Sequence, residues 1–443
     1  MKKFLNLSLL VAVLFGVLPT NHSYAADREH TLKVYNWADY IDESLLEEFE
    51  VWYKEQTGEE VEIIYQLFDI NEVMLAKLEK GHEDFDVVCP SEYIIDRMLA
   101  NDMLLPIPRD FGNTPDYTNL VSPYVIDQFS RMDKEGKPAN DYAVGYMWGT
   151  TGILYNPEYV TDEEVDSWGI IWDDRFEGKI LMKDAYRDIF GPMLMYARYQ
   201  DILDGKVTRE QLMNDSSDEA IATVENLLKA AKKNIAGWEA DFGKEMMTKK
   251  KAYMNVSWSG DAVWAIDEAA AIGMTLKYHV PREGSNVWFD GWVIPKYAVN
   301  TKAASYFINF MCMPENALRN MDEIGYVSVI ASPEILEAKI DSSLNEYIDL
   351  TYFFGEEADS VPVNSIQYPD QSVIDRAALM RDCGSRTKNM LEMWSRVKGD
   401  NLESWVIILI VVVLGAAIAW GIYNKMQQKK RQAKRKKKSQ RRR

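Results

Sequence analysis

The chain has 443 residues, of which 50 are lysine or arginine and 69 are aspartate or glutamate, so its formal net charge is −19. The last 20 residues hold 12 of these bases and the first 25 hold two, while every acid lies between them, so residues 26–404 carry −33. A net charge this negative excludes a protein that binds nucleic acids through their backbones, because such binding depends on neutralising phosphates with Lys and Arg. The length favours two or three lobes rather than one hydrophobic core.

The first 25 residues are typical of an export signal. Lys2 and Lys3 precede an apolar stretch over residues 4–19, and Ser23-Tyr24-Ala25 supplies small residues at the first and third positions of a cleavage site. An uncleaved N-terminal anchor is the alternative. In either case, the segment 1–25 predicts that the body behind it leaves the cytoplasm.

Patterns typical of strands and helices alternate along the body. The first region is predicted to hold strands at 31–35, 61–65 and 86–89 and helices near 45–52, 71–78 and 93–99. The second region is predicted to hold helices near 190–203 and 220–232, strands at 252–256, 274–279 and 292–294, and helices at 302–311 and 314–323. Because this alternation builds parallel sheets covered by helices, we predict an α/β fold of two lobes that binds its ligand beyond the carboxyl ends of the strands.

Aromatic residues with neighbouring acids recur where predicted strands give way to loops. The clusters are Trp37 with Asp39 and Tyr40, Tyr93 after Ser91 and Glu92, Trp258 with Asp261, Trp288 with Asp290, and Tyr326. A lone tryptophan is usually a core residue, but five clusters at such junctions favour a site. Aromatic faces attract a cation by ~0.5–2 kcal/mol each, and carboxylates accept its N–H donors in charge-assisted bonds. The pattern therefore predicts a site for an aliphatic ammonium ligand.

Motifs of catalysis and metal binding are missing from the sequence. There is no HExxH, GxSxG, GxxxxGK[ST] or GxGxxG, and the four histidines show no ligand spacing. Three cysteines are too few for a disulfide framework. We therefore expect no enzyme, no catalytic residue, no metal and no cofactor.

Six segments resemble the periplasmic spermidine/putrescine-binding proteins, the receptors of polyamine ABC importers. They are YNWADYI at 35–41, DVVCPSEYIIDRM at 86–98, GYMWGTTGILYN at 145–156, NVSWSGDAVWA at 255–265, WFDGWVIP at 288–295 and EIGYVSV at 323–329. The likeness covers about residues 30–398 and implies the two-lobed periplasmic-binding-protein (type II) fold with two crossovers. The implied lobes are 30–146 with 290–335 and 150–287 with 336–398.

The resemblance also implies a ligand site. It makes an aromatic box of Trp37, Tyr40, Tyr93, Trp258, Trp288 and Tyr326, with Asp39 and Ser91 as polar contacts from the first lobe. Asp290 matches the acid that holds one terminal ammonium. Asp261 matches an acid of putrescine-type members, and Asp188 aligns with the acid that faces the middle of a longer polyamine.

The sequence departs from the family pattern at several positions. Ala185 stands where the spermidine receptor has a ligand Asp, and Asp184 lies one residue early. A gapless alignment puts Met380 in place of a family Gln. Glu92 is an extra acid that either contacts the ligand or caps a helix, and we favour capping. These departures leave the preferred polyamine length open.

The C-terminal end predicts a membrane anchor. Residues 405–423 carry no charge, and at ~1.5 Å per residue such a helix just spans a ~30 Å hydrocarbon core. The basic tail 424–443 marks the cytoplasmic side, although RNA or anionic lipid are alternative partners for it. A buried core helix is disfavoured, because no such basic tail would follow it. We predict one C-terminal transmembrane helix, joined by a short linker at 399–404 to a body outside the cytoplasmic membrane.

The resulting hypothesis is a membrane-anchored receptor that captures putrescine or spermidine between its lobes and delivers it to an ABC permease. One alternative is a receptor of the same fold for another ligand, such as a cationic amino acid, a peptide or a sugar. A second is an extracytoplasmic glycoside hydrolase that uses Asp261 and Asp290 as an acid/base pair. A third is a membrane-anchored scaffold or sensor.

Overall fold

The computed structural model describes residues 28–240 and 242–399 together with residues 412 and 420. The predicted export signal, the basic tail and nearly all of the segment 405–423 lie outside these residues. Among the residues that are described, no helix is both long and apolar enough to cross a membrane.

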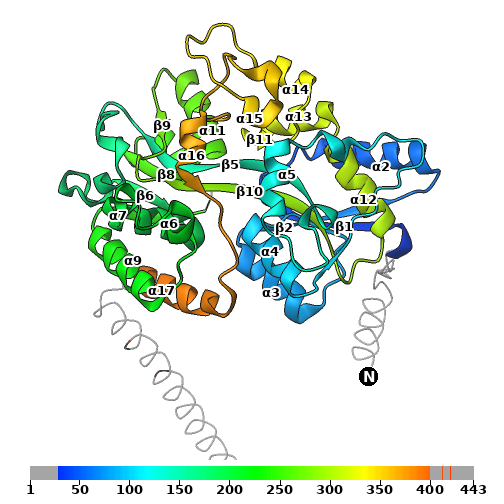
Figure 1. Cartoon of the computed structure of the whole chain (residues 1–443), viewed down its shortest axis with the longest axis horizontal. Helices are drawn as coiled ribbons and strands as arrows, with labels where there is room; N and C mark the ends of the chain where they lie inside the picture. The colour runs from blue at the N-terminus through cyan, green and yellow to red at the C-terminus, as the bar shows by residue number, and fades with distance from the viewer. Residues whose placement is uncertain (1–27, 241, 400–411, 413–419, 421–443) are drawn as a thin grey trace, which may run out of the picture.

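Two long strands run through the centre of the molecule. β5 (Ala143–Tyr155) and β10 (Ser285–Pro295) pair antiparallel and are buried along their whole length. The strand order is β2-β1-β3-β10-β5-β8-β6-β7, so β1 to β3 lie on one side of this pair and β6 to β8 on the other. Figure 1 shows the blue half around β1 and β2, the green half around β6 and β8, and β5 and β10 between them. The two lobes of the predicted fold are therefore present, and β5 and β10 are the crossovers.

The first lobe follows the predicted alternation of strands and helices. Its parallel strands are β1 (Thr31–Trp37), β2 (Glu62–Phe68) and β3 (Val87–Val88), and the helices after them are α2 (Ser44–Thr57), α3 (Asn71–Gly81) and α4 (Glu92–Ala100). α2 buries Leu45, Phe49 and Tyr53, which are spaced four residues apart on one helix face. α5 (Pro123–Ser130), α12 (Thr301–Met311) and α13 (Pro314–Ile324) complete this side of the molecule.

The second lobe is also a parallel sheet with helices. Its strands are β6 (Ile180–Lys183), β7 (Ile235–Glu239) and β8 (Met254–Trp258), and its helices include α6 (Tyr186–Ala197), α7 (Tyr199–Leu203), α9 (Asp218–Ala231), α11 (Ser259–Ala271) and α17 (Thr387–Gly399). β9 (Lys277–His279) pairs with β5. The predicted strand at 292–294 is too short, because β10 begins at Ser285. The first residues of β10 include polar ones, which interrupt the apolar pattern used to predict strands. They can be buried because they are hydrogen-bonded, as where the Ser285 hydroxyl donates to the carbonyl of Thr151.

One part of the chain lies apart from its predicted lobe. α14 (Pro333–Lys339) and α15 (Thr351–Phe354) follow the first lobe, and α15 packs against α5. The Ser122 hydroxyl before α5 donates to the carbonyl of Phe353, and the Tyr124 and Tyr352 rings are 5.3 Å apart. The segment 336–354 was expected in the second lobe and is instead held by these contacts to the first. The chain rejoins the second lobe where β12 (Ala377–Ala378) pairs with the start of β10.

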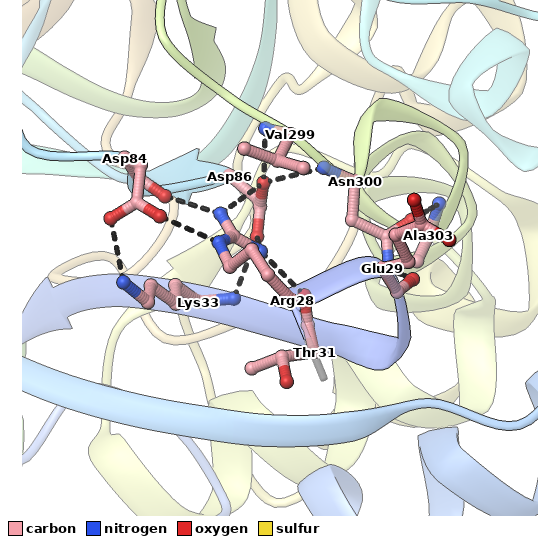
Figure 2. A network of polar contacts seen from close by, with 9 residues as sticks. All are labelled: Arg28, Glu29, Thr31, Lys33, Asp84, Asp86, Val299, Asn300 and Ala303. Atoms are coloured by element: carbon pink, nitrogen blue, oxygen red, sulfur yellow. Dashed lines mark hydrogen bonds and ion pairs between the residues drawn. The ribbon is translucent and has the colours of Figure 1, made fainter. Parts of the chain in front are cut away.

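A polar network fastens the first described residues to the sheet (Figure 2). The Asp86 carboxylate is fully buried and accepts hydrogen bonds from the Arg28 guanidinium and from the backbone N–H groups of Lys33 and residues 299–300. Asp84 accepts from Arg28 and Lys33 as well. The network thus joins the N-terminal end of β1 to the loop that enters α12, and it stabilises the end of the first lobe that faces away from the strand carboxyl ends.

Candidate functional site

A cavity of about 570 Å³ lies between the lobes, where the strands of both sheets end. This volume is within the range of small-molecule sites in proteins. All eleven predicted site residues line it, namely Trp37, Asp39, Tyr40, Ser91, Tyr93, Asp188, Trp258, Asp261, Trp288, Asp290 and Tyr326. The structure therefore brings these residues together from both lobes, and their role as ligand contacts stays a prediction.

Asp290 lies in β10 at a shift in the register with β5, a feature that can re-aim a side chain. Its Oδ1 accepts a hydrogen bond from the Ser91 hydroxyl at 2.6 Å, and its Oδ2 accepts one from the Tyr40 hydroxyl at 2.8 Å. Burial raises the pKa of the Asp290 carboxyl to about 7, because these two hydrogen bonds offset only part of the cost of ionising it. In the described part of the chain no cationic side chain pairs with it.

Asp188 occupies the first turn of α6 and has a similar environment. Its Oδ1 accepts hydrogen bonds from the indole N–H of Trp258 at 3.1 Å and from the Asn286 amide at 2.9 Å. Burial raises its pKa, although these donors and the nearby Arg187 act in the opposite direction. Asp188 is thus a buried carboxyl held by neutral donors from the ends of β8 and β10.

Asp261, in the first turn of α11, differs from the other two acids. Its Oδ2 lies 2.5 Å from the Nζ of Lys183, and its Oδ1 accepts the Tyr326 hydroxyl at 2.8 Å. Lys183 is fully buried and also pairs with Glu239 at 3.1 Å. Burial alone would lower the pKa of Lys183, but the two carboxylates raise it above its ordinary value. Asp261 therefore lines the cavity while holding an ammonium of the protein itself.

Glu72 is an acid that the sequence reasoning missed. It lines the cavity from the first turn of α3, and its Oε1 accepts the Tyr93 hydroxyl at 2.9 Å. Burial raises its pKa, and hydrogen bonds from Tyr93 and from Tyr186 of the second lobe offset part of this rise. Glu72 follows a strand in the same way as the predicted acids do, but no aromatic residue stands next to it in the sequence.

The aromatic residues form the remaining walls. The rings of Tyr40 and Tyr326 lie nearly perpendicular with centroids 5.2 Å apart, and Trp288 lies 5.5 Å from Tyr326. Trp258 and Tyr93 each have a cation of the protein over one face, Lys183 at 4.2 Å and Arg187 at 5.7 Å respectively. Part of the predicted aromatic box is thus already used for cation–π contacts within the protein.

Ser91 and Glu92 stand at the start of α4 and are both hydrogen-bonded to β10. Ser91 precedes α4, but its hydroxyl donates to Asp290 and makes no capping bond. Glu92 is buried and does not line the cavity, and its Oε2 accepts the backbone N–H of Phe289 in β10. This hydrogen bond ties α4 to the crossover, and α4 has no side-chain capping bond at its N-cap.

The structure also shows the surroundings of the residues that depart from the family pattern. Asp184 accepts hydrogen bonds from Lys398 and Trp394 of α17, so it does not replace the acid missing at Ala185. Ala185 and Met380 both line the cavity. Neither side chain carries a negative charge that could pair with a ligand ammonium, so in this part of the cavity the acids that could do so are Asp188 and Glu72.

Comparisons with known proteins point in the same direction. Residues 45–340, about two thirds of the chain, match the family described as bacterial extracellular solute-binding proteins. The chain is 28% identical over 386 residues to the spermidine/putrescine-binding periplasmic protein of Escherichia coli (strain K12), covering 86% of this chain and 96% of that protein. It is 26% identical over 414 residues to the putrescine-binding periplasmic protein SpuD of Pseudomonas aeruginosa (strain UCBPP-PA14), covering 90% and 99%. A solved structure described as a putative spermidine/putrescine ABC transporter from Listeria monocytogenes is similar at 29% identity, with a TM-score of 0.67 and coverage of 83% and 99%.

Proposed function

This chain belongs to the bacterial extracellular solute-binding proteins, which are receptors and not enzymes, and we propose that it captures a polyamine, putrescine or spermidine, between its two lobes for delivery to an ABC permease. The observation that carries the proposal is the buried Asp290 carboxyl, which has neutral hydrogen-bond donors and no cationic partner among the described residues. A carboxylate in this state is stabilised by any cation that reaches it.

The ligand class follows from the chemistry around this acid. Asp290 and Asp188 accept only neutral donors, and both have raised pKa values because they are buried. Charge-assisted hydrogen bonds from an ammonium group would satisfy such carboxyls, while the faces of Trp37 and Trp288 cover its methylene chain. A neutral sugar would leave the two carboxyls without a counter-charge, and this favours an amine.

The two lobes contribute complementary parts of the site. Asp290, Tyr40 and Ser91 belong to the first lobe and its crossover, whereas Asp188 and Trp258 belong to the second. A ligand that contacts both sets binds the closed arrangement of the lobes more tightly than an open one. Binding therefore shifts the population toward closure, which is the form offered to a permease.

Membrane attachment is a further part of the proposal. Residues 405–423 are uncharged and are followed by the basic tail, which supports a single-pass anchor with the lobes on the extracytoplasmic side. α17, the last described helix, lines the cavity through Leu391 and Trp394 and ends at Gly399. The linker 399–404 would reach roughly 20 Å at most, and so holds the receptor close to its permease at a high effective concentration.

The hydrolase alternative is set aside by the family and by the geometry. An acid/base pair needs both Asp261 and Asp290 to act on the substrate or on its attacking water. Asp261 is instead engaged by Lys183 and Tyr326 on both of its oxygens. A receptor for another cationic small molecule remains a possible outcome of the binding test.

Calorimetry of the full-length protein in non-ionic detergent tests the proposal. We expect micromolar or tighter binding of putrescine or spermidine and no heat with maltose. Asp290→Asn should weaken this binding roughly 30-fold or more. Asp127→Asn is the matched control, because Asp127 is exposed and pairs with Arg131 outside the cavity. Tight binding of arginine without any binding of polyamines would show that arginine, not a polyamine, is the ligand. The absence of binding heat with any amine would refute the proposal.

A further inference from the structure

Lys183 lies behind the cavity wall of the second lobe, at the end of β6. We propose that Lys183 is a resident ammonium, which fills the place that Asp261 and Trp258 would otherwise offer to a ligand and so limits the number of ligand ammonium groups that this lobe accepts. The inference rests on the proposed function, because it concerns the specificity of the same cavity.

The surroundings of Lys183 have the composition of an ammonium-binding site. Its Nζ lies 2.5 Å from Asp261, 3.1 Å from Glu239 and 2.9 Å from the carbonyl oxygen of Ala240. It also lies 4.2 Å from the centroid of the Trp258 ring. An ammonium has three N–H donors, and here each has an acceptor while the aromatic face covers the charge.

The strand order explains why these groups meet. β6 lies between β7 and β8, and all three strands run parallel, so their carboxyl ends meet at one edge of the sheet. Lys183 is the register partner of Glu239, and Trp258 ends β8. The side chain of Lys183 is fully buried, yet Asp261, Trp258 and Ala240 all line the cavity. The ammonium thus lies one layer behind the surface that a ligand touches.

This arrangement removes Asp261 from the acids that are open to a ligand. Its Oδ1 is bonded to Tyr326 and its Oδ2 to Lys183. A ligand ammonium would have to break a buried ion pair to reach it, and separating such pairs is strongly unfavourable. Asp290, Asp188 and Glu72 have no salt bridge among the described residues, so these carboxyls stay open to the ligand. Asp39 and Asp69, which are exposed, line the cavity as well.

The variant Lys183→Met with Glu239→Gln tests the inference at constant charge. It removes one positive and one negative charge and leaves Asp261 at the cavity wall without its ammonium. We expect the affinity of the full-length protein for the triamine spermidine, relative to the diamine putrescine, to rise about tenfold, because one more ammonium can form a charge-assisted hydrogen bond. The matched control is Lys277→Met with Asp162→Asn, an exposed ion pair of the same lobe, which should leave the ratio unchanged.

A ratio within threefold of the wild type, in a variant that still binds putrescine, would overturn the inference and leave the proposed function standing. If the double variant does not fold, a crystal structure of the wild-type protein with spermidine decides. We expect Lys183 to stay bonded to Asp261, with no ligand nitrogen within hydrogen-bond distance of that carboxylate, and a ligand nitrogen bonded to Asp261 would refute the inference. Wild-type protein that binds neither amine would overturn the proposed function and this inference together.

Discussion

In the proposed site, the buried carboxyl of Asp290 would couple ligand binding to pH. Its pKa of about 7 lies above the ordinary value of 3.8, so below pH 7 a ligand ammonium has to replace a proton on this group. We predict that the affinity for putrescine falls by up to roughly tenfold per pH unit between pH 7 and pH 5. Calorimetry in buffers of different ionisation enthalpy measures both the affinity and the protons released.

Asp290→Asn is the test of this assignment. The variant should lose about 2 kcal/mol or more of binding free energy, roughly 30-fold in affinity, at pH 8. Its remaining affinity should vary less with pH than that of the wild type, whereas Asp127→Asn should keep the wild-type pH profile. An unchanged slope in Asp290→Asn would assign the proton to another group, such as Asp188 or Glu72.

The same group links pH to the stability of the unliganded protein. Because the folded state raises the pKa of Asp290, it prefers the protonated carboxyl. The contribution of Asp290 to stability is therefore present below about pH 4 and is lost as the pH rises through 7. The melting midpoint of Asp290→Asn, measured without ligand, should fall less between pH 5 and pH 8 than that of the wild type.

Glu72 is the residue whose role was least visible beforehand. Glu72→Gln keeps an acceptor for the Tyr93 hydroxyl but removes the charge, so we expect about tenfold weaker polyamine binding and an unchanged melting midpoint. Glu79→Gln is the matched control, because Glu79 lies on the same helix and pairs with Arg97. Equal affinities for the two variants would show that Glu72 only positions Tyr93.

At the scale of elements, the crossovers decide the shape of the cavity. Gly149 lies in β5 opposite Trp288, and a Cβ at this position would clash with the Ser259 hydroxyl and come 2.6 Å from the Trp288 ring. Both neighbours are buried, so the ring has to move into the cavity or the strands have to separate. The glycine is required here for close packing between the crossover and the ligand wall.

Gly149→Ala should therefore lower both stability and affinity. Overpacking of this kind costs ~1–3 kcal/mol, and displacement of Trp288 removes an aromatic face from the ligand. Gly237→Ala in β7 is the control, because a Cβ there meets only ordinary contacts, at 3.6 Å and beyond. Thermal melting and calorimetry on both variants measure the two effects, and a Gly149→Ala protein with wild-type affinity would contradict the packing argument.

At the scale of the whole molecule, the net negative and net positive charges lie on different parts of the chain. The acidic body between residues 26 and 404 suits the attraction of polycations, and in the proposed anchoring the basic tail would mark the cytoplasmic side of the membrane. If the linker 399–404 keeps receptor and permease together, lengthening it by tens of residues should reduce polyamine uptake at equal protein level. Undiminished uptake, measured with radiolabelled putrescine, would show that the tether is dispensable.

Local patterns in the sequence were sufficient for much of this picture. Alternation of apolar residues and strand-to-helix junctions depend on neighbours along the chain, so they predicted two α/β lobes and placed Trp37 and Trp258 at strand ends. Asp290 was expected at such a junction, but it lies inside β10. The full length of β10 and the lobe to which α15 belongs were not predicted, because they depend on buried hydrogen bonds and on packing between segments that are far apart in the sequence.

The sequence by itself therefore determined the composition of the cavity wall, which consists of aromatic residues and acids. Only the tertiary structure decided which acids are open to a ligand. Asp261 is engaged by a lysine 78 residues away, and Glu72 joins the cavity through Tyr93, 21 residues further along the chain. The physical reason is that the charge state of a buried carboxyl depends on every donor that reaches it, and the fold alone brings those donors together.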